Sequence, residues 1–315
     1  RAAAAVELMV TPSANEVDLF GIYTNRGVTS AHAYLSRFGA QTDPHSDKDA
    51  QVWLSRGLKE SLLQFIKQAK AGDGLHVAIY EFEDADVAAG LAAAKDKGVE
   101  VHIVYHAKDA KQKTHNESML NAHGLGGPQH STARDKIINI SHNKFVVHLR
   151  NGVPKALWTG TCNFTFNGFY LQTNMALEVK HPVTAEAYES YFLILKRNQA
   201  VKGSNNPVKK EIAALIIRTE QALGQQNWKV NFSPVSQNHL LDISADLIKN
   251  AQSAVLVSAP FALDAALVKA LAQNDPKIIE YGLCNTTAKN KIQALKFNNT
   301  RFFTPSVLKT YMGQK

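Results

Sequence analysis

The sequence predicts an α/β fold, because segments with the period of an amphipathic helix alternate with short apolar runs that are typical of strands. Within 54–74, leucine, phenylalanine and isoleucine recur three and four residues apart, and glycines end the segment. The apolar run 75–82 follows, then an alanine-rich helical segment at 84–98 and a run at 99–105 that is rich in β-branched residues. A strand, a helix and another strand in this order indicate two parallel strands joined by a crossover helix.

The flanking parts of the first 200 residues are assigned from the same patterns. Residues 1–50 give weaker signals, a strand-like run at 6–10 and a helical segment at 29–38. Beyond residue 105 the patterns predict a helix at 115–124, a loop at 125–135, strands at 136–141 and 144–149, a turn at 151–156, strands at 157–165 and 174–180, and a helix capped by Thr184 at 184–198.

A linker and an internal repeat suggest how the chain is divided. Glycine, serine, asparagine and proline lie between charged residues in 201–210, which is the clearest linker. After it the order helix, strand, helix, strand returns, and "LIKNAQSAVLVSAPF" parallels "FIKQAK" and "LHVAIYEF" of the first half. We therefore predict an N-terminal extension at 1–50, a first lobe at 51–200, and a similar second lobe at 201–315 that is incomplete at its C-terminal end.

Composition limits the possible classes of function. The formal net charge of +8 suits a polyanionic partner, either nucleic acid or an anionic lipid surface, and equally suits a basic surface that only keeps the protein in solution. The two cysteines, Cys162 and Cys284, exclude a zinc site built on CxxC pairs, and so low a count is typical of a reducing compartment. No apolar run reaches the roughly 18 residues of a transmembrane helix. The localisation stays open between the cytoplasm and a secreted form.

The stretch "SHNKFVVHLRNGVPKALWTGTCNFT" carries the residues that suit chemistry on an anion. His142 and Lys144 are two residues apart, a spacing that places both on one face of a strand. A lysine can hold a phosphate oxygen, and an imidazole can attack phosphorus or transfer a proton. Thr161 and Asn163 offer neutral donors to the same oxygens. No metal ligands of suitable spacing lie near this stretch, so we expect neither a metal nor a cofactor.

This stretch resembles the phospholipase D superfamily, whose signature is HxK, then an aspartate, then GSxN or GTxN. The matching residues here are His142, Lys144, Gly160, Thr161 and Asn163. The resemblance covers roughly 55–200, and it is weaker from about 228 to the end. A second HxK triplet begins at His106, but no similar Gly-Thr-x-Asn sequence follows it, and we interpret it as incidental.

The resemblance implies a metal-independent reaction in two steps. His142 becomes covalently phosphorylated, and a histidine from a second motif acts as general acid and then as base. Gly160 and Thr161 are expected to help bind the substrate. Glu178 is where we expect the acidic residue that fixes the tautomer of the histidine. Leu149 stands where the family has its aspartate, and Asn151 is expected near that place.

The second half of the chain does not supply the second motif. No HxK follows His142, and the corresponding position of the repeat falls beyond Lys315. We expect the polypeptide to continue past this residue. The alternatives are a second chain that completes the active site, as in family members with one motif, and an inactive relative that only binds.

The function that this reading favours is hydrolysis or transfer of a phosphodiester, with a phospholipid slightly preferred and lipid degradation as the expected role. The alternatives are a nuclease of the same superfamily and a non-catalytic phosphate-binding relative. The aromatic loop 167–172 would suit a lipid, whereas the lysines in 108–113 would suit the backbone of a nucleic acid. The sequence leaves three questions open: whether the reaction is hydrolysis or transfer, which head group is preferred, and what the oligomeric state is.

Overall fold

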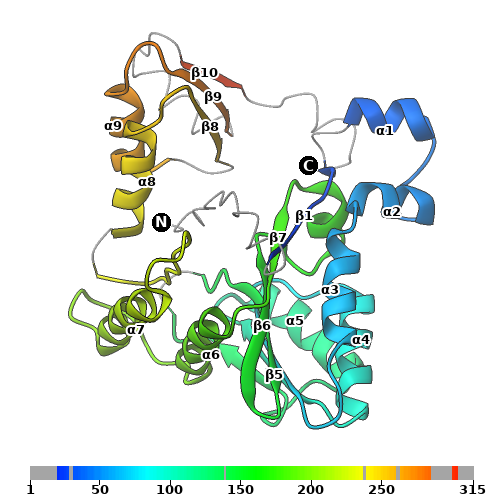
Figure 1. Ribbon diagram of the computed structural model, residues 1–315. Coiled ribbons are helices and arrows are strands. Elements are labelled where there is room, and N and C mark those ends of the chain that lie inside the picture. The colour runs from blue at the N-terminus through cyan, green and yellow to red at the C-terminus, as the bar shows by residue number, and fades with distance from the viewer. Residues whose placement is uncertain are drawn as a thin grey trace. The chain divides into compact units, whose positions relative to one another are not determined.

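The computed structural model describes residues 20–27, 31–137, 140–236, 239–259, 263–284 and 300–303. These residues form two compact units, which divide between Ser236 and Gln237, and each unit has its own sheet (Figure 1). The apolar run predicted at 6–10 and part of the strand predicted at 136–141 lie outside the described residues. In the described part of the chain, none of the helices has the length and apolar character needed to cross a bilayer.

The first unit is built on a seven-stranded mixed sheet with the order β1-β7-β6-β5-β2-β3-β4. Its strands are β1 (Phe20–Thr24), β2 (Gly74–Ile79), β3 (Glu100–His106), β4 (Ser131–Arg134), β5 (Lys144–Arg150), β6 (Val153–Gly160) and β7 (Met175–Val179). Its helices are α1 (Ala31–Phe38), α2 (Lys48–Ser55), α3 (Leu58–Lys67), α4 (Ala85–Asp96), α5 (Ala110–Ala122), η2 (Asn167–Leu171), α6 (Pro182–Lys196) and α7 (Pro207–Leu223). The predicted α/β class is confirmed.

The direction of the strands brings distant segments to one edge of this sheet. β2 is parallel to β3 and antiparallel to β5, and β5 is antiparallel to β6. The register pairs Ile79 at the end of β2 with Lys144 at the start of β5. On the other side of β5, Phe145 pairs with Thr159 near the end of β6. The carboxyl ends of β2, β3 and β6 therefore meet the amino end of β5, and this edge holds the candidate site.

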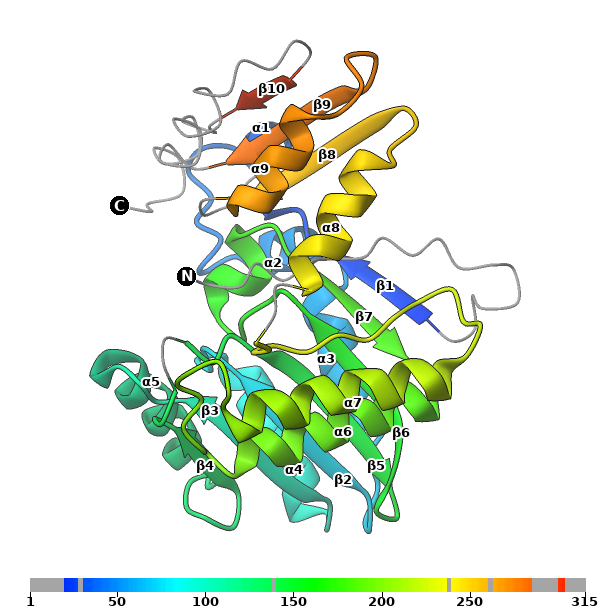
Figure 2. The same cartoon turned by 90° about the vertical axis from the view of Figure 1, so that its left-hand side faces the viewer.

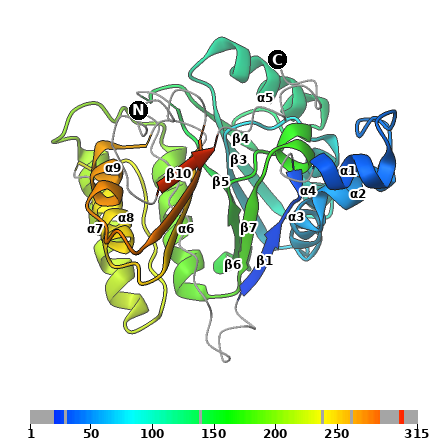
Figure 3. The same ribbon diagram turned by 90° about the horizontal axis from the view of Figure 1, so that it is seen from above.

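Helices cover both faces of the sheet. α6 and α7 lie along one face, and α3 and α4 lie along the other (Figures 2 and 3). The core under α6 and α7 includes Phe145 and Leu157 from the sheet and Phe192 and Ile212 from the helices. On the opposite face Trp158 is fully buried, and its indole N–H donates to the Ser61 hydroxyl of α3 at 3.0 Å. Burial on both faces explains why the central strands are almost continuously apolar.

Three local predictions differ from the structure. The helix predicted at 54–74 is two helices, because Arg56 and Gly57 adopt φ values of 51° and 93° and break the chain between α2 and α3. The loop predicted at 125–135 contains β4, a polar strand that pairs with β3 and has no apolar alternation to reveal it. α6 begins two residues before Thr184, and the side chain of His181 caps it by accepting from the Thr184 N–H.

The limits of the first unit also differ from those expected. Residues 20–24, within the expected N-terminal extension, form the edge strand β1 and pair with β7. The expected boundary at residue 201 lies inside the unit, because α7 follows the predicted linker and buries Val208, Ile212 and Leu215 in the core. The unit therefore needs residues beyond 200 to complete its core.

The second unit contains α8 (His239–Lys249), β8 (Ala254–Ala259), α9 (Ala265–Ala272), β9 (Ile279–Cys284) and β10 (Thr300–Phe303). Its three strands are parallel and have the order β10-β9-β8. A small core of Ala245, Leu267 and Ala270 joins the two helices. The predicted order helix, strand, helix, strand is thus present, while its assignment as a second lobe of the same family stays a prediction.

Candidate active site

Lys144 is a nearly buried cation at the first position of β5. Its side chain is 5% exposed, and Nζ donates to the main-chain oxygen of His142 at 3.2 Å. Nζ also lies 5.4 Å from the centre of the Tyr80 ring. Burial lowers the pKa of Lys144 to about 7, against the opposing influence of Glu81. No carboxylate forms an ion pair with this lysine among the described residues, so its charge is available to an anionic ligand.

The spacing predicts that His142 lies on the same strand as Lys144. In the structure His142 instead lies two residues before β5. Its ring keeps access to solvent and packs edge-on against Tyr80, with 4.8 Å between ring centroids. Partial removal of water lowers the pKa of His142 to about 4, and the charge of Lys144 and the nearby His106 act in the same direction. At neutral pH the imidazole is uncharged and has a free nitrogen lone pair, which is the form required of a nucleophile.

A second histidine fixes the loop that carries His142. His106, at the end of β3, is fully buried, and its Nδ1 accepts from the Ser141 main-chain N–H at 3.2 Å. Its Nε2 therefore carries the proton and donates to Asp109 at 2.8 Å. His106, whose HxK triplet we interpreted as incidental, thus holds the His142 loop from β3, the strand next to β2. The sequence feature that could have indicated this role is Asp109, three residues later, which caps α5.

Asn163 reaches the same sheet edge from the loop after β6. It is buried, and its amide nitrogen donates to the Glu81 carboxylate. Its amide oxygen has no hydrogen-bond partner. A bridge between Phe82 and Phe164 holds this loop beside the segment that follows β2, and the Phe164 N–H donates to the main-chain oxygen of Glu81 at 3.0 Å. A buried amide with an unused acceptor is costly unless a ligand completes it.

Gly160 and Thr161 shape this loop and use their own groups to do so. A side chain at Gly160 would lie 2.2 Å from the Met175 main-chain oxygen, so only glycine fits there. The Thr161 hydroxyl donates to the Asn174 side chain at 2.8 Å and accepts from the Met175 N–H at 3.1 Å. Both residues therefore position Asn163 between β6 and β7, and the hydroxyl expected to contact substrate is already occupied.

The structure does not bring Glu178 to His142. Register pairs Gly160 with Ala176, so Glu178 lies two residues further into the sheet, opposite Trp158. There its carboxylate lies 3.7 Å from the ammonium of Lys180 and helps to raise the pKa of Tyr23 on β1. Its contacts are those of a residue that joins β7 to its neighbours. Glu81 is the acidic residue that the structure places at the site.

Leu149 and Asn151 lie at the opposite end of β5. Leu149 is buried and pairs with Gly74 at the start of β2, away from Lys144. Asn151 occupies the turn into β6 with a φ of 49°. Both positions therefore lie at the end of the hairpin that is away from the site edge.

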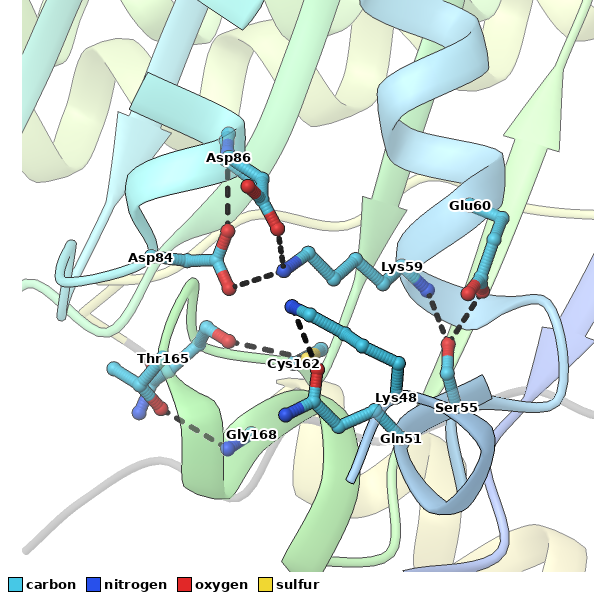
Figure 4. Close-up of polar contacts among 12 residues, drawn as sticks. Lys48, Gln51, Ser55, Lys59, Glu60, Asp84, Asp86, Cys162, Thr165 and Gly168 are labelled. Atoms are coloured by element: carbon cyan, nitrogen blue, oxygen red, sulfur yellow. Dashed lines mark hydrogen bonds and ion pairs between the residues drawn. The ribbon is translucent and has the colours of Figure 1, made fainter. Parts of the chain in front are cut away.

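An ion-pair cluster centred on the buried Lys59 lies beside the loop that follows β6 (Figure 4). Lys59 of α3 donates to Asp84 at 2.8 Å and to Asp86 at 2.7 Å. Asp84 also caps α4 by accepting from the Val87 N–H, and its own N–H donates to the Phe164 main-chain oxygen at 2.8 Å. Lys59 thus ties α3, α4 and the loop together. In the part of the chain that the structure describes, no group of histidine, cysteine and carboxylate side chains is arranged to hold a metal ion.

One family model matches part of the chain. Residues 62–196 match the family model described as "Cardiolipin synthase, PLD-like domain". These residues form a phospholipase D-like domain. It contains Lys144, His142, Asn163, His106 and Glu81, so the whole candidate site lies within the matched segment.

Several solved structures are similar to parts of this chain. The phospholipase D family member Nuc from Salmonella typhimurium is 22% identical, with 45% of this chain and 88% of that chain covered and a TM-score of 0.37. NucT from Helicobacter pylori is 20% identical, with 47% and 92% covered and a TM-score of 0.37. Phosphatidylserine synthase from Haemophilus influenzae Rd KW20 is 14% identical, with 73% and 60% covered and a TM-score of 0.48. No curated protein matches the chain.

Proposed function

We propose that the protein is a phosphodiesterase of the phospholipase D type that acts through a phosphohistidine on His142. The observation that carries the proposal is the pairing of an uncharged, solvent-accessible imidazole with the buried Lys144 against the same Tyr80 ring. The imidazole supplies the nucleophile, and the ammonium attracts the anion that it attacks. Such a pair favours a substrate with a negative charge at the reacting centre.

The reaction follows from these positions. A ring nitrogen of His142 forms a bond to phosphorus while the bond from phosphorus to the leaving oxygen breaks and its electron pair stays on that oxygen. The leaving oxygen takes up a proton. Water then attacks phosphorus, loses a proton, and releases the phosphorylated product and free imidazole. Lys144 and the amide N–H of Asn163 that does not donate to Glu81 hold the non-bridging oxygens, which carry the charge that grows in each transition state.

The substrate that we favour is a phospholipid. The family model is described as cardiolipin synthase, whose name points to phospholipid chemistry. A nucleic acid is the second candidate, because Lys108, Lys111 and Lys113 are exposed at the start of α5, directly after the strand that carries His106. A row of exposed lysines beside the site suits a phosphate backbone.

Two assays on the full chain test the proposal. Hydrolysis of a chromogenic phosphodiester should occur with the native chain and be absent with His142→Asn, and a chelator should leave the rate unchanged. Mass spectrometry after alkaline quenching should show, on His142, one phosphoryl group that still carries the remaining ester substituent of the substrate. Release of the chromogenic alcohol at the native rate by His142→Asn would refute the proposed nucleophile. Parallel assays with phospholipid vesicles and single-stranded DNA then decide the substrate class.

The leaving oxygen needs a proton donor, and we infer that a partner segment or chain supplies it. A second histidine, from a further segment of the polypeptide or from a second copy of the chain, would serve as the general acid, a contribution of about 10²–10⁴-fold in rate. If a second copy supplies it, the rate per chain should increase with protein concentration in step with dimer formation measured by sedimentation. A rate per chain that is independent of concentration in a strictly monomeric sample would exclude the second copy.

A further inference from the structure

The side chain of Glu81 lies beside the two residues that, in the proposed function, bind the phosphodiester. Its main-chain oxygen is fixed by the Phe164 N–H, and its carboxylate accepts a hydrogen bond from the amide of Asn163. The carboxylate is also near enough to Lys144 for each to influence the other's charge. Glu81 therefore engages the same two residues that would hold the phosphoryl oxygens, although neither the motif nor the spacing singles it out.

The charges around Glu81 are mixed. Glu83 follows it in the chain, and Asp109 faces it from the start of α5; both are negative. Lys144 on β5 is the positive group near Glu81. Tyr80 directly precedes Glu81 in the chain. Burial raises the pKa of Glu81 first, Glu83 and Asp109 raise it further, and Lys144 and the bond from Asn163 lower it. The site thus makes the neutral form of this carboxyl more accessible than at the surface.

A phosphodiester that binds to Lys144 and Asn163 changes this balance. Its negative charge weakens the influence of Lys144 on Glu81 and adds a repulsion of its own. A carboxylate that stays charged would oppose binding. A carboxyl that gains a proton removes the repulsion and acquires an O–H donor for a phosphoryl oxygen.

We propose that Glu81 is a further substrate-contacting residue, which binds the phosphoryl group as a neutral acid after taking up one proton from solvent. The proposal rests on the proposed function only in taking the ligand to be a phosphodiester. No covalent bond of the substrate is involved, because the proton moves from water to the carboxylate and its O–H then donates to a non-bridging oxygen. The same carboxylate, when charged and without ligand, holds Asn163 in place.

Calorimetry with dimethyl phosphate tests the proton uptake. The charge of this diester is constant between about pH 5 and about pH 9, because a phosphodiester has no second ionisation in that range. Binding to the full chain is measured at one pH in buffers with different ionisation enthalpies, which gives the number of protons taken up. We expect the native protein to take up about one proton more than Glu81→Gln, since any uptake by Lys144 is common to both.

Glu83→Gln is the matched control. It removes one nearby negative charge, but this exposed side chain contacts His115 at 3.0 Å and not Asn163. Its proton uptake should equal that of the native protein. Infrared difference spectra should show a new protonated carboxyl band on binding in the native protein and in Glu83→Gln, and none in Glu81→Gln.

The outcomes separate this inference from the proposed function. Equal proton uptake by the native protein and Glu81→Gln, with no carboxyl band, would overturn the inference and leave the phosphodiesterase proposal intact. If Glu81→Gln is poorly folded, the infrared band in the native protein still decides. Proton-coupled binding without hydrolysis would support the inference and count against the enzyme. Failure of the native protein to bind the diester at any pH would overturn both.

Discussion

The interior of the large sheet and its site edge differ in how their titratable side chains are paired. Away from the site edge, His76 on β2 contacts Glu189 at 2.8 Å, and His148 near the far end of β5 contacts Asp73 at 2.9 Å. His102 on β3 bonds to the Thr132 hydroxyl at 2.8 Å. At the edge, and among the described residues, the His142 ring packs against Tyr80 without a side-chain hydrogen bond, and Lys144 Nζ donates to one main-chain oxygen and lies over the same Tyr80 ring.

The difference shows which polar residues maintain the fold and which are reserved for a ligand. A buried polar group without a partner costs free energy, so natural cores pair such groups. In the described part of the chain, His76, His148 and His102 each have a side-chain partner, on α6, before β2 and on β4 respectively, although Nε2 of His76 has no hydrogen-bond partner. At the site edge, again among the residues that the structure describes, the amide oxygen of Asn163 is unpaired, and Lys144 is a buried cation without a carboxylate in an ion pair. Such shifted and unpaired groups in one place are typical of a functional site.

Removal of the edge histidine should have the largest effect. We expect His142→Ala to lower kcat by at least about 10³-fold, because the proposed nucleophile is lost. Its melting temperature should stay close to the native value, since the exposed ring contributes little to core packing. Initial-rate kinetics and thermal unfolding give the two numbers.

His115→Ala is the control for this prediction, because His115 is exposed on α5 and pairs with Glu83 outside the site. It should keep the native kcat. A His142→Ala preparation with a large remaining rate would show that the edge does not carry the reaction.

The edge lysine should come next. Lys144→Met should lower kcat/KM by about 10²–10³-fold, since the charge that stabilises the transition state is removed. Its free energy of unfolding should be equal or higher, because a buried cation without a carboxylate partner is replaced by an apolar side chain. Urea denaturation and steady-state kinetics check both. Lys111→Met, on the exposed face of α5, is the matched control, and a loss of stability without loss of rate in Lys144→Met would reverse the assignment.

Breaking a pair inside the sheet should give the opposite result. Asp73→Ala leaves the buried His148 without its partner, and we expect the free energy of unfolding to fall by about 3 kcal/mol. The specific activity of the folded protein should not change, because the pair lies at the far end of β5 from Lys144. Urea unfolding gives the first quantity, and rates normalised to folded protein give the second. An unchanged midpoint would mean that this pair contributes nothing to the fold.

The smallest effect should come from acid titration inside the sheet. Burial lowers the pKa of His102 from 6.5 to about 4, so below 6.5 the unfolded chain binds a proton that the folded chain does not. Stability from this residue is complete above pH 6.5 and is lost as the pH falls towards 4, by about 1 to 2 kcal/mol in all, because solvent screens part of the effect. His102→Gln should remove this contribution, and urea titrations at both pH values measure it. A native pH dependence equal to that of His102→Gln would contradict the prediction.

The motif itself could be read from the sequence because it is local. His142 and Lys144 are two residues apart, and Gly160 to Asn163 follow within one hairpin, so neighbouring residues define them without knowledge of the fold. The alternation of strands and helices was visible for the same reason, since each element buries its apolar side chains with its own period. Errors arose where this signal is absent, as in the polar strand β4.

Only the tertiary structure decided which acidic residue belongs to the site. Glu81 and Asn163 are 82 residues apart, and they meet because β2 and β6 end at the same edge. Glu178 is closer to the motif in sequence, but strand register places it two residues into the sheet, beside Trp158. His106 likewise contacts Ser141 because it lies at the end of β3, which is parallel to β2 in the sheet. Register and strand order are set by packing over the whole sheet, so no local pattern contains them.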